Sequence, residues 1–284
     1  MTTPFITSFF DEPTNTISHL VGDPTTRTAA VIDPVLDFDL ASGEADTRSA
    51  ERIVAFAADN GWIIAMVLET HAHADHLSAA PYIKARTGAW IGIGEHIRQV
   101  QRTFRPVFAL DDLNTDGSDF DRLFVDGEHF ALGELDVEVM HVPGHTPADI
   151  AYRIGAVAFV GDTLFMPDYG TARADFPGGD ARALYRLFLC HDYKAPGRDD
   201  YRWETTVGEQ RRNSIHVHDG VSEREFVAMR EARDQTLAVP KLLLPSIQVN
   251  IRAGRMPRAE ANGVSYLKIP VRCKAGPVGE TAGA

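Results

Sequence analysis

Histidine and carboxylate side chains are concentrated in one short stretch of this 284-residue chain, His71-Ala72-His73-Ala74-Asp75-His76. Such a pattern arises on the order of once in a thousand chains of this length and composition, so chance explains it poorly. Imidazole and carboxylate groups are ligands of iron, zinc and manganese, and alternate residues that leave a strand in a tight loop can converge on one ion. The stretch therefore predicts a metal site. The alternative is that Asp75 only caps a helix and one histidine only fills the core.

Three further polar residues stand at the ends of apolar segments downstream. They are His145 in Pro143-Gly144-His145-Thr146, Asp162 in Gly161-Asp162-Thr163, and His191 in Cys190-His191-Asp192-Tyr193. Taken singly, each is as well explained by a structural or turn role. Because they follow the histidine-rich stretch in order, each becomes a candidate ligand of the same site.

The elements that must position these residues follow from the hydrophobic pattern. Strands at 17–21 and 29–32 are predicted to form an opening antiparallel hairpin, and a helix at 47–60 is terminated by Gly61. Segment 62–68 is almost continuously apolar, which is typical of a strand covered on both faces, and it runs directly into the histidine-rich stretch. The metal site is therefore expected at the carboxyl end of a buried strand.

The rest of the chain predicts a layered α/β fold. Strands that bracket helices in both halves indicate two sheets inside and helices outside, a four-layer αββα sandwich with a helical C-terminal segment. Residues 1–270 are expected to form one catalytic domain, and 271–284 a loose tail. Helices are predicted at 77–86, 96–105, 180–186, 209–215, 223–236 and 246–254, and strands at 89–94, 122–125, 128–131, 136–141, 150–154, 156–160 and 187–190.

Composition and charge limit the possible partners. The 28 Lys and Arg against 40 Asp and Glu give a net charge of -12, which disfavours nucleic acid as a partner. No signal or transit peptide is legible, and no apolar run approaches bilayer-spanning length. The two cysteines, Cys190 and Cys273, do not form a disulfide framework. We expect a cytoplasmic protein with neither nucleic acid nor a membrane as its partner.

Taken in order, the four motifs around residues 71–76, 145, 162 and 191 resemble those of the metallo-β-lactamase superfamily, across residues 5–195. The stretch from Thr70 to Leu77 narrows the resemblance to the glyoxalase II and persulfide dioxygenase branches. Segments 161–179, 190–198 and 245–254 resemble bacterial persulfide dioxygenases, also called sulfur dioxygenases. They extend the resemblance to about residue 270.

The dioxygenase resemblance implies one Fe(II) per chain, held by His71, His145 and Asp162 with open positions for substrate and dioxygen. The implied reaction oxidises glutathione persulfide with dioxygen and water to sulfite and glutathione. Other residues would orient the ligands or stay free of the metal. These are His73, Asp75, His76 and His191.

The glyoxalase II resemblance implies a different use of the same residues. Two zinc or iron ions would be bound with Asp162 between them, and a bridging hydroxide would attack a glutathione thioester. Bare spacing fits both chemistries, while the sequence around the last histidine favours the dioxygenase. One ion would be held by His71, His73 and His145, and the other by Asp75, His76 and His191.

Further residues are assigned by resemblance alone. Arg173 lies where the family places an arginine near the glutathione carboxylate, and its alternative role is a pair with Asp175. Tyr193 is expected beside the iron-bound ligand, and the adjacent Asp192 is a second catalytic candidate. Thr146, Asn250 and Arg252 are further substrate-binding candidates, and relatives suggest a homodimer.

One junction departs from the family pattern. The helix ending at Arg186 meets the strand beginning at Leu187 without turn residues, although such connections ordinarily need about 2 to 6 residues. We expect this junction to affect stability and substrate fit more than metal binding, because His71, His145 and Asp162 all precede it.

Overall fold

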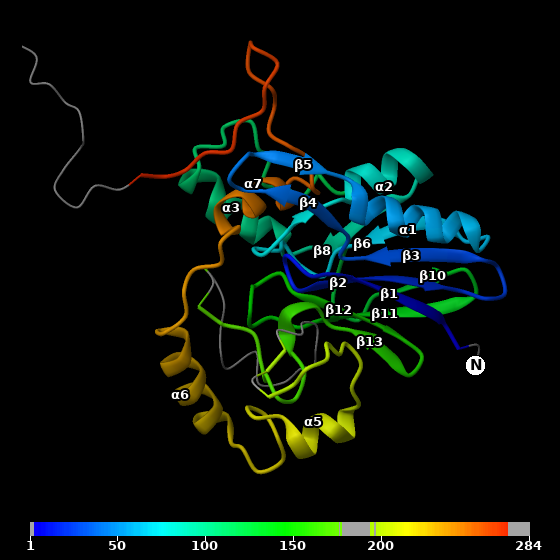
Figure 1. Cartoon of the computed structure of the whole chain (residues 1–284), viewed down its shortest axis with the longest axis vertical. Helices are drawn as coiled ribbons and strands as arrows, with labels where there is room; N and C mark the ends of the chain where they lie inside the picture. The colour runs from blue at the N-terminus through cyan, green and yellow to red at the C-terminus, as the bar shows by residue number, and fades with distance from the viewer. Residues whose placement is uncertain (1–2, 176, 178–193, 196, 272–284) are drawn as a thin grey trace, which may run out of the picture.

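The structure is a computed structural model that describes residues 3–175, 177, 194–195 and 197–271 (Figure 1). Its largest sheet has six strands in the order β1-β2-β3-β6-β8-β9. The first three strands are antiparallel neighbours, whereas β3, β6, β8 and β9 run parallel, so their carboxyl ends meet at one edge. The strands are β1 (Phe5–Asp11), β2 (Thr16–Gly22), β3 (Thr28–Ile32), β6 (Ile63–Leu68), β8 (Trp90–Gly94) and β9 (Arg122–Phe124).

A second sheet has four antiparallel strands that follow one another along the chain. They are β10 (His129–Leu132), β11 (Leu135–His141), β12 (Ile150–Ile154) and β13 (Val157–Phe159). A small third sheet places β4 (Val35–Asp39) between β5 (Glu44–Asp46) and the two-residue β7 (Leu77–Ser78).

Helices lie on the outer sides of the two larger sheets (Figure 1). The first sheet packs against α1 (Arg48–Asp59), α2 (Ala80–Thr87), α3 (Ile97–Val107) and α7 (Leu243–Asn250). Figure 1 shows α5 (Val207–Asn213) and α6 (Glu223–Asp234) on the side of the second sheet. The order of helices, sheet, sheet and helices confirms the predicted four-layer αββα sandwich.

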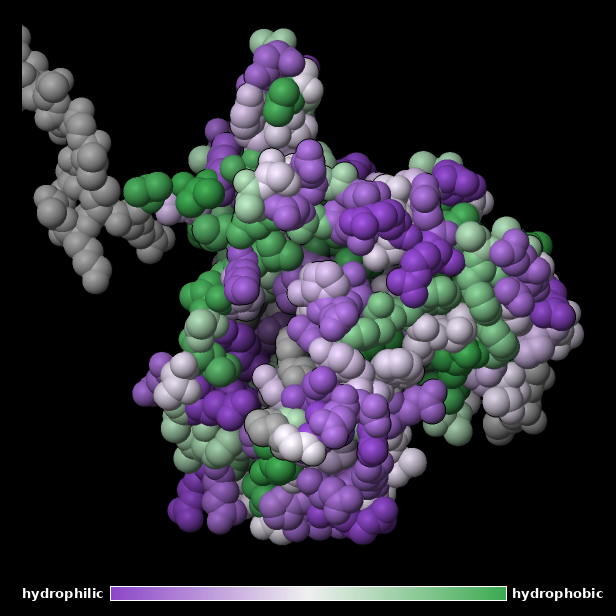
Figure 2. Space-filling model, in the orientation of Figure 1, coloured by the Kyte–Doolittle hydropathy of each residue, from purple (hydrophilic) through white to green (hydrophobic). Residues whose placement is uncertain are grey.

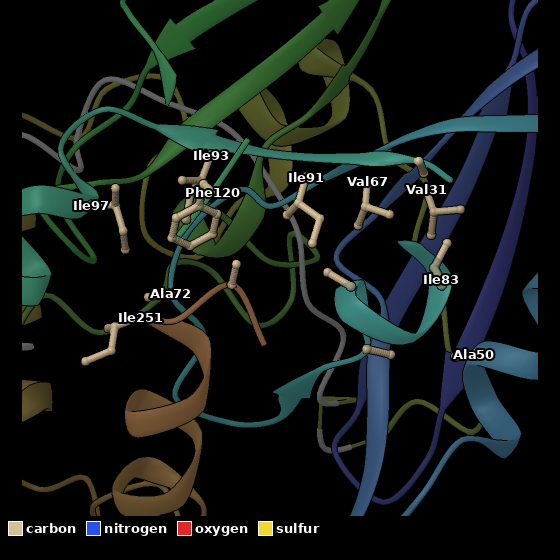
Figure 3. Close-up of a cluster of buried hydrophobic side chains, with 14 of the residues drawn as sticks. Val31, Ala50, Val67, Ala72, Ile83, Ile91, Ile93, Ile97, Phe120 and Ile251 are labelled. Carbon is tan, nitrogen blue, oxygen red and sulfur yellow. The ribbon is translucent and has the colours of Figure 1, made fainter. Parts of the chain in front are cut away.

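Alternation along the strands divides the core into two layers. In β3, Ala29 and Val31 belong to the layer under the helices, whereas Ala30 and Ile32 belong to the layer between the sheets. Figure 3 shows part of the layer under the helices, in which Val67, Ile83 and Ile91 lie close to Val31. On the face seen in Figure 2, hydrophilic side chains predominate and hydrophobic residues form small separate areas.

Three aromatic side chains join the two larger sheets. Phe124 at the end of β9 stacks on Phe130 of β10 with ring centroids 4.8 Å apart, and the ring of Tyr152 meets Phe124 edge-on at 5.8 Å. The hydroxyl of Tyr152 donates a hydrogen bond to the carbonyl oxygen of Glu69, 3.0 Å away. This cluster therefore connects the second sheet to the loop that follows β6.

Most predicted elements are present, and the differences have local causes. The helix expected from Leu77 begins only at Ala80, because Leu77 and Ser78 pair with β4 and Pro81 suits the first turn of a helix. The last helix covers Leu243–Asn250 rather than 246–254. Strands β1, β4 and β5 had no predicted counterpart, since their residues are mostly half-buried or exposed and show little hydrophobic alternation.

The predicted elements between residues 180 and 190, with the Arg186–Leu187 junction, lie outside the described residues. The same holds for the predicted tail except for Val271, and the single-domain assignment of 1–270 stays a prediction. Within the described part of the chain, no helix combines the length and the apolar character needed to cross a membrane.

The aromatic cluster makes Phe124 a sensitive position for stability. Phe124 is 1% exposed, so Phe124→Ala should lower the free energy of unfolding by about 3–5 kcal/mol through lost burial and the cavity left behind. Urea unfolding followed by circular dichroism measures the change. Leu40→Ala, at a side chain that is 51% exposed, is the control and should change the value by less than about 0.5 kcal/mol. Equal effects of the two substitutions would contradict this role of Phe124.

Candidate metal centre

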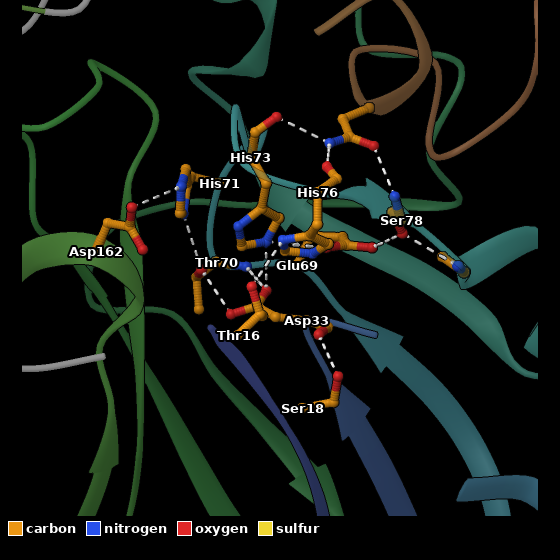
Figure 4. A network of polar contacts seen from close by, with 12 residues as sticks. Thr16, Ser18, Asp33, Glu69, Thr70, His71, His73, His76, Ser78 and Asp162 are labelled. Carbon is orange, nitrogen blue, oxygen red and sulfur yellow. Dashed lines mark hydrogen bonds and ion pairs between the residues drawn. The ribbon is translucent and has the colours of Figure 1, made fainter. Parts of the chain in front are cut away.

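Loops from both larger sheets converge where the parallel strands end (Figure 4). Residues 69–76 follow β6, and His145 lies on the connection between β11 and β12. Asp162 lies on a single 3-10 turn, Gly161–Thr163, that follows β13. Asp33 directly follows β3. The structure thus places the histidine-rich stretch at the carboxyl end of a buried strand, as the sequence predicts.

The three residues expected to bind iron lie close together and are buried. Nε2 of His145 lies 3.4 Å from Oδ2 of Asp162, and Nε2 of His71 lies 3.8 Å from the same oxygen. The rings of His71 and His145 are perpendicular, with centroids 5.2 Å apart. One candidate ligand atom from each residue lies within 4.8 Å of the other two. Two imidazoles and one carboxylate therefore form a compact potential ligand set.

A second group lies beside the first. His73, Asp75 and His76 also offer one atom each within 4.8 Å of one another. The ring of His73 is 4.1 Å from that of His71 and 4.2 Å from that of His76, centroid to centroid. The described residues thus provide two adjacent groups of possible ligands. The mononuclear chemistry would use only the first group, whereas the dinuclear chemistry would draw ligands from both.

Hydrogen bonds fix which nitrogen of each imidazole faces the site. The Thr70 hydroxyl donates to Oδ2 of Asp33 at 2.8 Å, so its oxygen accepts from Nδ1 of His71 at 3.0 Å. Nδ1 of His145 donates to the carbonyl oxygen of Arg173 at 2.8 Å. Nε2 of His73 lies 3.0 Å from Oδ1 of Asp33 and 3.4 Å from Oε2 of Glu69. One nitrogen of each of these rings is therefore held by the protein, and the other faces the site.

The ring nitrogens that the protein does not hold indicate whether a metal ion would fit. Among the described residues, Nε2 of His71, Nδ1 of His73 and Nε2 of His76 are buried and have no hydrogen-bond partner. A buried polar atom without a partner is costly, and a metal ion supplies the missing interaction. The residues present therefore fit a bound metal at the first group and leave nitrogens available at the second.

Burial and neighbouring charged groups shift the pKa values of ionisable side chains at the site. Burial lowers the pKa of His71 well below its usual value, and the nearby His73 adds to this effect. Burial also opposes protonation of His73, but Asp33 and Glu69 outweigh it and hold the pKa of His73 well above its usual range. Burial raises the pKa of Asp149, next to the His145 loop, to about 6.

Gly161 permits the close approach of the Asp162 turn to the histidine loop. Its φ is +54°, and a Cβ atom there would lie 2.6 Å from Oγ1 of Thr70 and 3.3 Å from Nδ1 of His71. Any side chain at this position would push the turn away from His71. Glycine is therefore needed here for both conformation and space.

The predicted substrate-binding residues have partners within the protein. Arg173 forms an ion pair with Asp175 at 2.6 Å and donates to the carbonyl oxygen of Ala238 at 2.7 Å. Thr146 is buried and its hydroxyl donates to Oδ1 of Asp149 at 2.6 Å. Arg252 pairs with Asp112 at 2.8 Å. The roles of these residues in substrate binding stay predictions.

The carbonyl oxygen that orients His145 belongs to a segment held by α6. Arg230, which is almost fully buried, donates to the carbonyl oxygen of Thr171 at 3.0 Å and pairs with Asp234. Asp234 in turn accepts from the backbone N–H of Ala174 at 2.9 Å. Residues 171–174 are thus fixed on both sides of Arg173.

Two carboxylates near the ligands, Asp33 and Glu69, were not among the predicted site residues. Both follow apolar strands directly, as His71 nearly does, and that position is the signal that locates them. The remaining predicted site residues, His191, Asp192 and Tyr193, lie outside the described residues.

A sequence model of the Metallo-beta-lactamase superfamily matches residues 13–204, a range that includes every candidate metal ligand. The chain belongs to this superfamily.

Several relatives match most of the chain. A probable metallo-hydrolase of Burkholderia pseudomallei is 50% identical over 94% of this chain and 98% of its own length. A beta-lactamase hydrolase-like protein of Xylella fastidiosa is 50% identical over 96% of this chain, which spans only 66% of that relative. Glyoxylase B2 of Dictyostelium discoideum is 44% identical over 89% of this chain and 91% of its own.

Two proteins named ETHE1 are also similar. The crystal structure of ETHE1 from Myxococcus xanthus has a TM-score of 0.70 and 27% identity, over 88% of this chain and 100% of that one. The persulfide dioxygenase ETHE1 of Bos taurus is 23% identical over 86% of this chain and 87% of its own.

The Gly161 contact yields a matched pair of substitutions. Gly161→Ala and Gly155→Ala place a side chain at φ values of +54° and +61°, but only position 161 has atoms within 4 Å of the new Cβ. Backbone strain should cost about 1 kcal/mol of stability in both variants, and the overlap with Thr70 should add to this cost in Gly161→Ala. Only Gly161→Ala should also weaken metal binding, measured by competition with a chelator. Equal metal affinities in the two variants would refute the role given to Gly161.

Asp33 gives a second prediction, because it supports both Thr70 and His73. Asp33→Ala should weaken metal binding about 10- to 100-fold, as is typical when a group behind a ligand is removed. Asp23→Ala is the control, since Asp23 is a buried carboxylate that accepts hydrogen bonds from Thr26 and from the N–H of Glu134 away from the site. Its loss should lower the melting temperature and leave the metal affinity unchanged. Metal binding by Asp33→Ala at wild-type strength would exclude this role.

Proposed function

We propose that this protein is a metal-dependent enzyme that acts at the sulfur of a glutathione derivative. The reaction that we propose for it is the oxidation of glutathione persulfide. In balanced form, the persulfide, dioxygen and water give glutathione, sulfite and two protons. The outer sulfur loses four electrons and dioxygen accepts them. The S–S bond breaks and the parent thiol is released.

One observation carries this proposal. Two of the three segments whose sequence resembles persulfide dioxygenases contain or contact the candidate ligands in the described part of the chain. Segment 161–179 contains Asp162 and the Arg173 carbonyl that orients His145. Segment 245–254 contains Asn250, which bonds to the backbone of His73 and His76. The correspondence with the ETHE1 structure over 88% of the chain supports this proposal.

Each residue of the centre has a distinct role in the proposed reaction. A ferrous ion held by His71, His145 and Asp162 would supply redox chemistry with open positions for sulfur and dioxygen. Thr70 and the Arg173 carbonyl hold the Nδ1 protons of His71 and His145, so that each Nε2 keeps its lone pair. Burial of all three ligands limits the access of water. Arg173 is proposed to meet a glutathione carboxylate by exchanging its pair with Asp175.

A second candidate is hydrolysis of a glutathione thioester at a dinuclear centre. The names of the relatives at 44–50% identity, metallo-hydrolase, hydrolase-like protein and glyoxylase, favour hydrolysis over dioxygenation. The ring nitrogens of His73 and His76 that lack partners among the described residues also suit a second ion. The two candidates differ in metal number and in their need for dioxygen.

The proposal predicts stoichiometric oxygen use. Protein purified without air and loaded with Fe(II) should consume one dioxygen for each sulfite formed from glutathione persulfide, as followed with an oxygen electrode. His71→Ala should abolish both because the ion loses a ligand, whereas His129→Ala, at an exposed histidine of β10, should change neither. Hydrolysis of S-lactoylglutathione without oxygen uptake would reject the dioxygenase and favour the second candidate.

A further inference from the structure

Helix α7 is short, and every residue from Pro245 to Asn250 is buried, polar ones included. Buried polar side chains need partners within the protein. Gln248 finds them in the backbone, where its amide donates to the carbonyl oxygens of Leu244 and Lys268. Asn250 lies two residues further on. Its partners are in the loop of residues 69–76, called the metal loop below, and in the adjoining β7.

The Asn250 amide makes three hydrogen bonds, two to the loop of residues 69–76 and one to Ser78 of the adjoining β7. Nδ2 donates to the carbonyl oxygens of His73 at 2.9 Å and His76 at 2.7 Å. Oδ1 accepts from the backbone N–H of Ser78 at 2.8 Å. Residues 69–76 form neither helix nor strand. At the start of the loop, the backbone of Glu69 and Thr70 still bonds to Gly92 of β8 and Ile150 of β12, whereas the carbonyl oxygens of His73 and His76 are met by the Asn250 side chain. One side chain therefore supplies the partners of two carbonyl oxygens in the part of the loop that carries His73 and His76.

From these contacts we infer that Asn250 is a positioning residue of the metal centre. It fixes the backbone at His73 and His76, and thereby aims Nδ1 of His73 and Nε2 of His76 at the site. This differs from the substrate contact expected from the sequence, because Asn250 is 4% exposed and its amide already bonds to the loop on both sides.

Asn250 also influences the ring of His73 indirectly, through Ser78 and Glu69. The Ser78 hydroxyl donates a short hydrogen bond to Oε1 of Glu69, and Oε2 of Glu69 lies 3.4 Å from Nε2 of His73. By holding the N–H of Ser78, Asn250 keeps this hydroxyl in place. Both the backbone and the ring of His73 are therefore tied to α7.

The segment that follows α7 lies closely against β7 and the start of α2, which directly follow the loop. Gly254 has a φ of +78°, and a Cβ atom there would lie 2.6 Å from Cδ of Pro81 and 2.7 Å from the carbonyl oxygen of Ser78. This close approach leaves Asn250 little freedom to move away from the loop. The amide is therefore suited to a fixed positioning role rather than to a mobile one.

The inference rests on the metal centre of the proposed function and on neither of its two chemistries. The test therefore measures metal binding without substrate, with Co(II) as the probe and a competing chelator. Asn250→Ala should weaken Co(II) binding about 10- to 100-fold and alter the visible absorption of the bound ion, because His73 and His76, which lie against the centre in either chemistry, are no longer held in place. Gln248→Ala removes a buried amide from the same helix and should lower the melting temperature of the metal-free protein without changing either property.

Asn250→Asp separates positioning from loss of packing. It has nearly the same size and keeps an acceptor for the Ser78 N–H, but it has no N–H to donate to His73 and His76. It should also weaken Co(II) binding and change the absorption spectrum. Wild-type affinity and spectrum in both Asn250 variants would overturn the inference, as would an equal loss in Gln248→Ala. Failure of the wild-type protein to bind any metal would instead reject the proposed function.

Discussion

The buried carboxylate of Asp33 is the group on which the metal loop depends. It accepts hydrogen bonds from the N–H and the hydroxyl of Thr70, both at 2.8 Å, and from the ring of His73 at 3.0 Å. A carboxylate without partners would be very costly in this position, so these donors are what make its burial possible. Because Thr70 also bonds to His71, one anion sets the orientation of two neighbouring imidazoles.

The other supports of the centre come from remote parts of the chain. The carbonyl oxygen that orients His145 is fixed by Arg230 and Asp234 of α6, and the backbone of His73 and His76 is fixed by Asn250 of α7. Removing one partner of the buried Arg230–Asp234 pair would leave a charge uncompensated. The helices beyond the two sheets therefore serve the centre through directed hydrogen bonds as well as by covering the core.

The sequence was sufficient to predict the fold and to select candidate ligands at 71–76, 145 and 162, which the structure brings together, but it did not identify the groups that support them. The spacing of His71, His73 and His76 after an apolar strand indicates a metal loop, because strand ends and ligand types are local features. Asp33 also follows an apolar strand and has the same local signal, which is recognised only when β3 and β6 are known to be parallel neighbours. The contact of Asn250 with His73 joins residues 177 positions apart, and no local pattern encodes such a pairing.

The most direct test of this account is anomalous diffraction at the iron absorption edge, from crystals grown without air and loaded with Fe(II). The account predicts a single strong peak between His71, His145 and Asp162, with no second peak between His73, Asp75 and His76. A second peak of equal height at the latter group would contradict the mononuclear centre and support a dinuclear hydrolase. A peak at neither group would refute the assignment of the metal centre itself.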